Sequence, residues 1–271
     1  MSLLTSNMPD WRSAESYRPL LDADLATWAW EFGRRAQGLV YDPEGVCFAA
    51  PGPGADPHPA VIWRADVDPA VPTLTASPAE AGDAGALDIL DLKLPVAVVR
   101  CEQGSQHVLV CDGERRLRFS IVQGDVLVGP VALAFPFPAR TAGVASLESL
   151  RALIHLRDTG RLPVGGRGPG RATRWIATLR AHDARRDGAS QREIAVMLFG
   201  EGRVAADWAG ASDYMRMRVQ RLIRAAEAMV SGGYRAVCGL SSPNGDADRP
   251  VETWLSRWTT AWRPNNSGGL G

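Results

Sequence analysis

Apolar residues in the carboxyl-proximal half of the chain repeat with a helical period. Between Asp213 and Val230 seven of them recur at positions i, i+4, i+7, i+8, i+11, i+14 and i+15, which predicts a helix with one buried face. At about 100° per residue, Gln220, Arg221 and Arg224 project away from that face, so the opposite side of the helix is lined by arginine. The residues predicted to be buried are Met215, Val219, Leu222, Ile223, Ala226, Met229 and Val230.

A shorter helix is predicted just before this one, over Ser190 to Phe199, where Glu193 follows Ser190 in capping-box position. The two helices have the layout of a helix-turn-helix, in which the first helix braces the second against the major groove of DNA. The connection over 200–211 is longer than the roughly three or four residues usual for the motif, so a variant form is expected. Ser212 would then cap the second helix.

Elsewhere the pattern predicts an α+β protein. Residues 1–40 are predicted to form two short helices, 41–85 a loop-rich connection with one or two edge strands, and 86–140 a small antiparallel β-meander. An all-α domain of helix-turn-helix type is predicted over 144–238, and a largely flexible tail with a tryptophan-rich helix over 239–271. The expected strands are 61–63, 71–74, 87–92, 96–101, 108–110, 117–121 and 126–128, and two further helices are expected over 146–160 and 172–183.

The formal net charge of the 271 residues is zero, but the charges are segregated along the chain. Residues 1–150 hold 11 basic against 19 acidic residues, whereas 151–235 hold 16 arginines against 8 acidic residues. Lys93 is the only lysine, so nearly every basic residue is an arginine. The choice of arginine over lysine therefore says nothing about function, whereas the positions of the arginines do. The surplus of arginine favours a polyanionic partner for the second segment.

Double-stranded DNA fits both the helix pattern and the charge. The predicted base contacts are Gln220, Arg221 and Arg224, because glutamine can bridge adenine and arginine can bridge the O6 and N7 atoms of guanine. Side chains at the borders of the arginine-lined face and in nearby loops are expected to contact phosphates instead. These predicted phosphate contacts are Arg167, Arg171, Arg192, Ser212, Arg216 and Arg218.

Other classes of function find little support. The four cysteines show no CxxC spacing and the four histidines do not cluster, so neither a metal site nor a disulfide framework is expected. There is no phosphate-binding loop, carboxylate pair or nucleophile elbow, which argues against an enzyme and predicts no cofactor. No signal peptide or membrane span is predicted, and a cytoplasmic location is expected.

Several short motifs together resemble the DNA-binding domain of RovC-type transcriptional activators. Asp10-Trp11-Arg12, Tyr17 and 28–32 also resemble the transcriptional-regulator-like domain that often precedes it. The resemblance implies a helix-turn-helix module acting at secretion loci or mobile elements, a homo-oligomer, and DNA contacts by arginines 216, 218, 221 and 224. The motifs are Ala189 to Ala195, Leu198 to Gly200, Asp207-Trp208, Ser212-Asp213, Arg216 to Leu222 and Gly232 to Arg235, with Leu162-Pro163 and Arg174-Trp175 upstream.

The tail holds Trp254, Trp258 and Trp262 at helical spacing, and on a helix they would form one exposed aromatic ridge. The ridge could dock on its own domain, or it could contact another subunit, RNA polymerase or a regulatory protein. A second function therefore stays open at this point. In this alternative the chain is an interaction or adaptor regulator whose helix-turn-helix-like domain does not bind DNA.

Overall fold

The computed structural model describes residues 9–36, 45–50, 59–101, 104–136, 144–164, 169–208, 214–240 and 260–263. The chain folds into two compact units. The sheet unit consists of residues 44–166 with the carboxyl-terminal stretch from 239 onward, and the helical unit consists of residues 5–43 and 167–238. The predicted α+β class with a helical carboxyl-proximal domain is confirmed.

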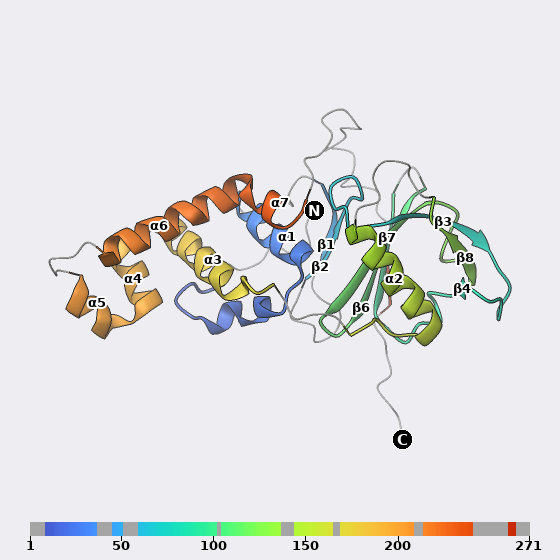
Figure 1. Cartoon of the computed structure of the whole chain (residues 1–271), viewed down its shortest axis with the longest axis horizontal. Coiled ribbons are helices and arrows are strands. Elements are labelled where there is room, and N and C mark those ends of the chain that lie inside the picture. Colours follow the sequence, from blue (N-terminus) through green and yellow to red (C-terminus); the bar gives the residue numbers. More distant parts are fainter. Residues whose placement is uncertain are drawn as a thin grey trace, which may run out of the picture. The chain divides into compact units, whose positions relative to one another are not determined.

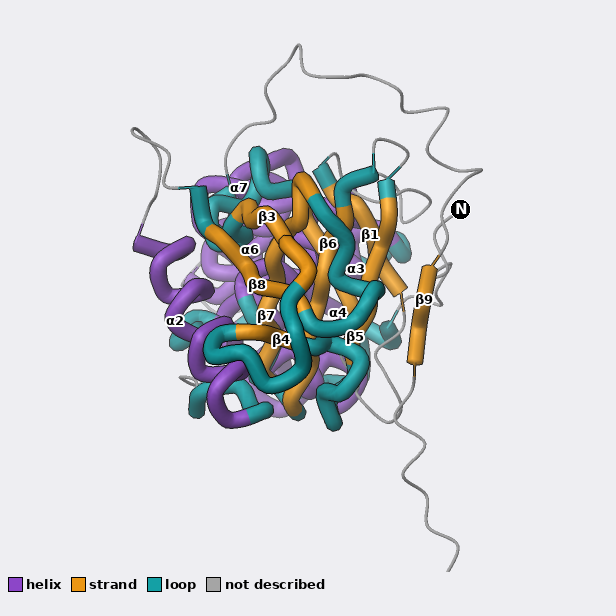
Figure 2. The backbone as a smooth tube through the Cα atoms, turned by 90° about the vertical axis from the view of Figure 1, so that its right-hand side faces the viewer, coloured by secondary structure: helices purple, strands orange, loops and turns teal. Residues whose placement is uncertain are grey.

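The sheet unit is built on a mixed sheet with strand order β4-β8-β3-β7-β6-β5-β9 in the described part of the chain. Strands β5, β6 and β7 form the predicted antiparallel meander, whereas β3 pairs with β7 in parallel. β9 lies at the outer edge of the sheet (Figure 2). The strands are β3 Thr73–Pro78, β4 Ala86–Leu87, β5 Val96–Arg100, β6 Gln106–Asp112, β7 Arg115–Gln123, β8 Val131–Ala134 and β9 Thr260–Arg263.

Both faces of the central strands are covered. Val108 and Val110 of β6 belong to a core that includes Leu153 and Leu156 of helix α2, which spans Val144–Thr159 (Figure 1). The alternate residue Leu109 packs with Ile62 on the other face, where β2 (Ala60–Trp63) pairs with β1 (Val46–Ala50) in a separate two-stranded sheet. Apolar residues at consecutive positions of β6 therefore reflect burial on both sides.

Several sequence-based expectations for this unit are wrong. The strand found at 73–78 is an interior strand, flanked by β7 and β8, rather than an edge strand. Residues 126–128 form a turn, because the Val126 amide donates to Gln106 Oε1 and the Leu127 amide to Asp125 Oδ1 in place of a strand partner. Of the run 87–92, only the first residue lies in a strand.

The helical unit combines segments from both ends of the chain. It comprises a short 3-10 helix η1, the helices α1, α3, α4, α5 and α6, a π-helical turn η2 and a last short helix α7 (Figure 1). The predicted pair of amino-terminal helices is present, and Pro19 lies inside η1 rather than between them. The bounds are η1 Glu15–Leu21, α1 Leu25–Ala36, α3 Ala172–Arg186, α4 Gln191–Phe199, α5 Glu201–Asp207, α6 Tyr214–Ala228, η2 Met229–Gly233 and α7 Tyr234–Val237.

This arrangement differs from the predicted division of the chain in two respects. Residues 9–36 pack with the carboxyl-proximal helices instead of forming a region of their own. Helix α2, which was placed in the helical domain, belongs to the sheet unit because Leu153 and Leu156 complete the sheet core.

The core of the helical unit lies among α3, α4, α5 and α6. Ile194 and Ala195 of α4, Val219 of α6 and Val204 of α5 are all buried there. Trp11, from the amino-terminal segment, is a member of the same cluster. A second contact joins α1 to α3: the Trp28 ring meets the Trp175 ring edge-on, with ring centroids 5.1 Å apart. The two segments thus share one hydrophobic core.

Candidate nucleic-acid interface

Helix α6 buries the face that its sequence pattern predicts. Met215, Val219, Ile223 and Ala226 are buried, and Val230 continues the face into η2. On the opposite side Gln220, Arg221 and Arg224 are exposed. Within the described residues, neither Arg221 nor Arg224 forms an ion pair, so both guanidinium groups are available to a ligand. This exposed side carrying Gln220, Arg221 and Arg224 is called the arginine face below.

Arg216 and Arg218 are exposed at the two borders of the arginine face. The Arg218 guanidinium carbon lies 4.8 Å from the centroid of the Phe199 ring, at the end of α4. A cation over an aromatic ring is held by the ring quadrupole, so Arg218 has a preferred orientation toward α4. The contact also ties the two helices of the predicted motif together.

Helix α4 begins with the predicted capping box. The Ser190 hydroxyl accepts a hydrogen bond from the Glu193 amide at 3.2 Å, and Glu193 Oε2 accepts one from the Ser190 amide at 2.8 Å. The hydrogen bond from the Ser190 amide lowers the pKa of Glu193, so the carboxylate stays charged at the helix start. The first turn of α4 is therefore stabilised by local interactions alone.

The connection between α4 and α6 is long, as predicted, but it is not simply a turn. Helix α5 occupies Glu201–Asp207, directly after Gly200. Gly200 has a φ of +85°, a left-handed conformation that glycine adopts at little cost, and it lets the chain start a new helix at once. Val204 is fully buried and anchors α5 in the core. The connection from α4 to α6 is thus partly a packed helix.

The remaining predicted phosphate contacts differ in their surroundings. Arg171 is exposed at the residue before α3. Arg192 is exposed on α4, and its Nη2 atom lies 3.2 Å from Glu201 Oε1. Such an exposed ion pair contributes little, about 0–1 kcal/mol, so it could exchange for a phosphate. Arg167 and Ser212 lie outside the described residues.

The tryptophan-rich tail is described only in part. Trp254 and Trp258 lie outside the described residues. Trp262 lies in strand β9, in register with Ala97 of β5, so the predicted helix is wrong at this position.

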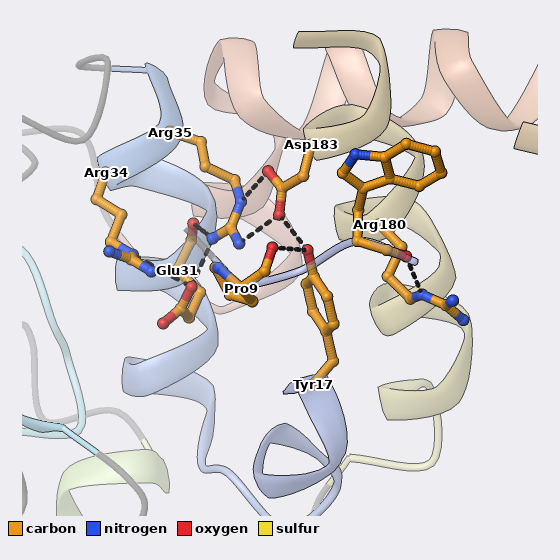
Figure 3. A network of polar contacts seen from close by, with 8 residues as sticks. Pro9, Tyr17, Glu31, Arg34, Arg35, Arg180 and Asp183 are labelled. Carbon is orange, nitrogen blue, oxygen red and sulfur yellow. Dashed lines mark hydrogen bonds and ion pairs between the residues drawn. The ribbon is translucent and has the colours of Figure 1, made fainter. Parts of the chain in front are cut away.

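A buried ion-pair network joins the two segments of the helical unit. The Asp183 carboxylate on α3 is fully buried and accepts two hydrogen bonds from Arg35 of α1, from Nε and Nη2, both at 2.8 Å (Figure 3). The Tyr17 hydroxyl of η1 donates to Asp183 Oδ2 at 2.7 Å. Arg35 also pairs with Glu31 one turn earlier. Both of these side-chain partners of Asp183, Tyr17 and Arg35, therefore come from residues 9–36.

Burial and charge fix the protonation of this network. Burial raises the pKa of Tyr17 above its usual range, and the charge of Asp183 and the hydrogen bond to it act in the same direction. Burial alone would lower the pKa of Arg35, but Glu31 and Asp183 outweigh it and raise that pKa. Tyr17 thus keeps its proton to donate, and Arg35 keeps its charge.

Three more hydrogen bonds join the amino-terminal segment to α3 and to Asp187, the residue that follows it. Arg180 donates from Nε and Nη2 to the carbonyl oxygens of Trp11 and Arg12, both at 2.9 Å. The Trp11 indole donates from Nε1 to Asp187 Oδ2 at 2.8 Å. Arg180 is buried, so this arginine of the basic segment 151–235 supports the fold rather than the surface.

Comparison with known families agrees with the resemblance drawn from the motifs. Residues 134–238 match the family model described as "T6SS, Transcription factor, DNA binding domain", named for RovC. The chain therefore contains a transcription-factor DNA-binding domain of the RovC type. No curated protein matches the chain.

Membrane-spanning helices and metal sites are the two remaining features to consider. None of the helices in the described ranges is both long and apolar enough to cross a membrane. Among the described side chains, histidine, cysteine and carboxylate residues form no group of three or more that could hold a metal ion.

Proposed function

Because residues 134–238 match a transcription-factor DNA-binding domain, we propose that the protein is a sequence-specific regulator of transcription, acting as an activator. In this proposal α6 lies in the major groove and its arginine face reads base edges. The observation that carries the proposal is the burial of one face of α6 while Gln220, Arg221 and Arg224 are exposed on the other.

The position of each side chain on α6 determines whether it is assigned to bases or to phosphates. Arg221 and Arg224 point away from the core, so they can extend to the O6 and N7 atoms of guanine, and Gln220 can pair with adenine. Arg216 and Arg218 lie at the borders of the face, where the sugar-phosphate backbones flank the groove. Arg171 and Arg192 would add phosphate contacts from α3 and α4, and Arg167 and Ser212 remain candidates on the sequence alone.

Salt dependence tests the proposal directly. With Arg171, Arg192, Arg216 and Arg218 on four phosphates, the logarithm of the binding constant should fall with the logarithm of salt concentration with a slope of roughly −3.6. Affinity should then drop roughly 150-fold between about 50 and 200 mM salt. Fluorescence anisotropy with fragments of the DNA that surrounds its own coding region would measure the slope. The absence of any salt-sensitive binding, with a protein partner co-purifying in its place, would favour an adaptor.

Single arginine replacements should separate base contacts from phosphate contacts. We expect Arg221→Ala and Arg224→Ala each to cost about 1–3 kcal/mol on the preferred sequence and to relax the preference at one base pair. Arg218→Ala should weaken binding to all sequences alike and make the salt slope shallower by about one.

Binding measured on a library of randomised sites would show these two patterns. Arg18→Ala, an exposed arginine of η1, serves as the matched control and should leave both affinity and preference unchanged. Equal, sequence-independent losses for Arg218, Arg221 and Arg224 would contradict the assignment of base contacts.

A further inference from the structure

The exposed side of α6 has an apolar residue at its centre. Met217 is 50% exposed, and its neighbours on this side of the helix are Tyr214, which is 59% exposed, and the polar or charged residues Gln220, Arg221 and Arg224. It makes no contribution to the buried face, which is complete with Met215, Val219, Ile223 and Ala226.

Helical geometry places Met217 directly opposite the core. It precedes Ala226 by nine residues, which at about 100° per residue is about 180° around the axis, and Ala226 is buried. Arg221 and Arg224 lie within about 40° of Met217 on the same side, four and seven residues further on. Arg216 and Arg218 lie about 100° away on either side. Met217 therefore stands on the midline of the arginine face, one turn nearer the start of the helix.

The charges around Met217 indicate which kind of molecule binds this side of the helix. Four exposed guanidinium groups on one helix, at positions 216, 218, 221 and 224, favour a polyanion over an apolar protein surface. In the major groove the base edges offer hydrogen-bonding groups and a single apolar group, the 5-methyl of thymine. An unbranched thioether side chain adapts readily to such a small apolar group.

We propose that Met217 is a specificity-determining residue that contacts the 5-methyl group of a thymine, beside the base pairs read by Arg221 and Arg224. This inference rests on the proposed function, since it assumes that α6 lies in the major groove. It adds a thymine to the guanine and adenine contacts already assigned to the arginine face.

Replacing thymine by uracil tests the contact, because uracil lacks only the 5-methyl group. On a fragment that binds with the expected salt dependence, each thymine would be replaced in turn. The wild-type protein should lose about fourfold in affinity at one position, the effect of one apolar carbon no longer buried. Met217→Ala should lose about as much on the thymine fragment and show no further loss with uracil at that position.

Ile154→Ala provides the matched control, because Ile154 is 52% exposed on α2 and lies outside the helical unit. It should keep the wild-type sensitivity to uracil at every position. The inference is wrong if Met217→Ala also keeps that sensitivity, or if it changes only the mass of the assembly in solution. Failure of the wild-type protein to bind any fragment would instead defeat the proposed function.

Discussion

Replacing Asp183 by alanine is expected to lower the free energy of unfolding of the helical unit by about 3–5 kcal/mol. The substitution leaves the Arg35 guanidinium fully buried with one carboxylate partner fewer, and it removes the acceptor of the Tyr17 hydroxyl. A buried charge without its partner costs far more than the ion pair contributed in the first place. Urea unfolding followed by far-ultraviolet circular dichroism would measure the change.

Two further variants make this expectation specific to the network. Arg35→Met combined with Asp183→Leu should recover only part of the lost stability, because the apolar pair removes these two buried charges but leaves Glu31 with Arg34 alone and takes Asp183 away from the Tyr17 hydroxyl. Arg18→Met breaks the exposed pair with Glu15, at 3.1 Å, and should cost no more than about 1 kcal/mol. A loss for Asp183→Ala as small as that for Arg18→Met would show that the network does not stabilise the fold.

A fragment limited to residues 134–238 is expected neither to fold cooperatively nor to bind DNA, although it covers the whole family match. It would carry α2 without the sheet on which Leu153 and Leu156 pack, and α3 without Trp28 and Arg35 of α1. Exposed apolar surface and an unpaired Asp183 would both oppose folding. Thermal unfolding and anisotropy, each run beside the full chain, would test the fragment.

The matched comparison for that fragment is the full chain carrying Ile154→Ala, which disturbs neither unit's core. It should unfold cooperatively and keep the affinity of the wild type. Cooperative unfolding of the 134–238 fragment with the affinity of the full chain would show that the amino-terminal helices are dispensable.

Local signals were sufficient to predict the candidate interface. The buried face of α6 and the capping box of α4 depend on residues a few positions apart, so periodicity and spacing identify them. Helix α5 was missed because a single buried residue such as Val204 gives no periodic pattern, and because Gly200 and Gly202 resemble a loop. Met217 was missed because an exposed apolar residue outside the buried face does not alter the helical periodicity of the apolar positions.

Long-range pairing could not be predicted in the same way. Arg35 and Asp183 are 148 residues apart, and each is an ordinary charged residue in its local sequence. The parallel pairing of β3 with β7 likewise depends on segments far apart, and nothing in 71–74 distinguishes an interior strand from an edge strand. The amino-terminal helices were thus predicted, but not their place in the helical unit.

The separation of Arg35 from Asp183 also matters while the protein is being made. A ribosome adds about 5–20 residues per second, so α1 is synthesised about 7–30 s before its partner α3. During that interval Trp28, Phe32 and Arg35, all buried in the finished fold, have no α3 to pack against. The nascent chain therefore presents an aromatic, cationic segment to chaperones until α3 has been synthesised.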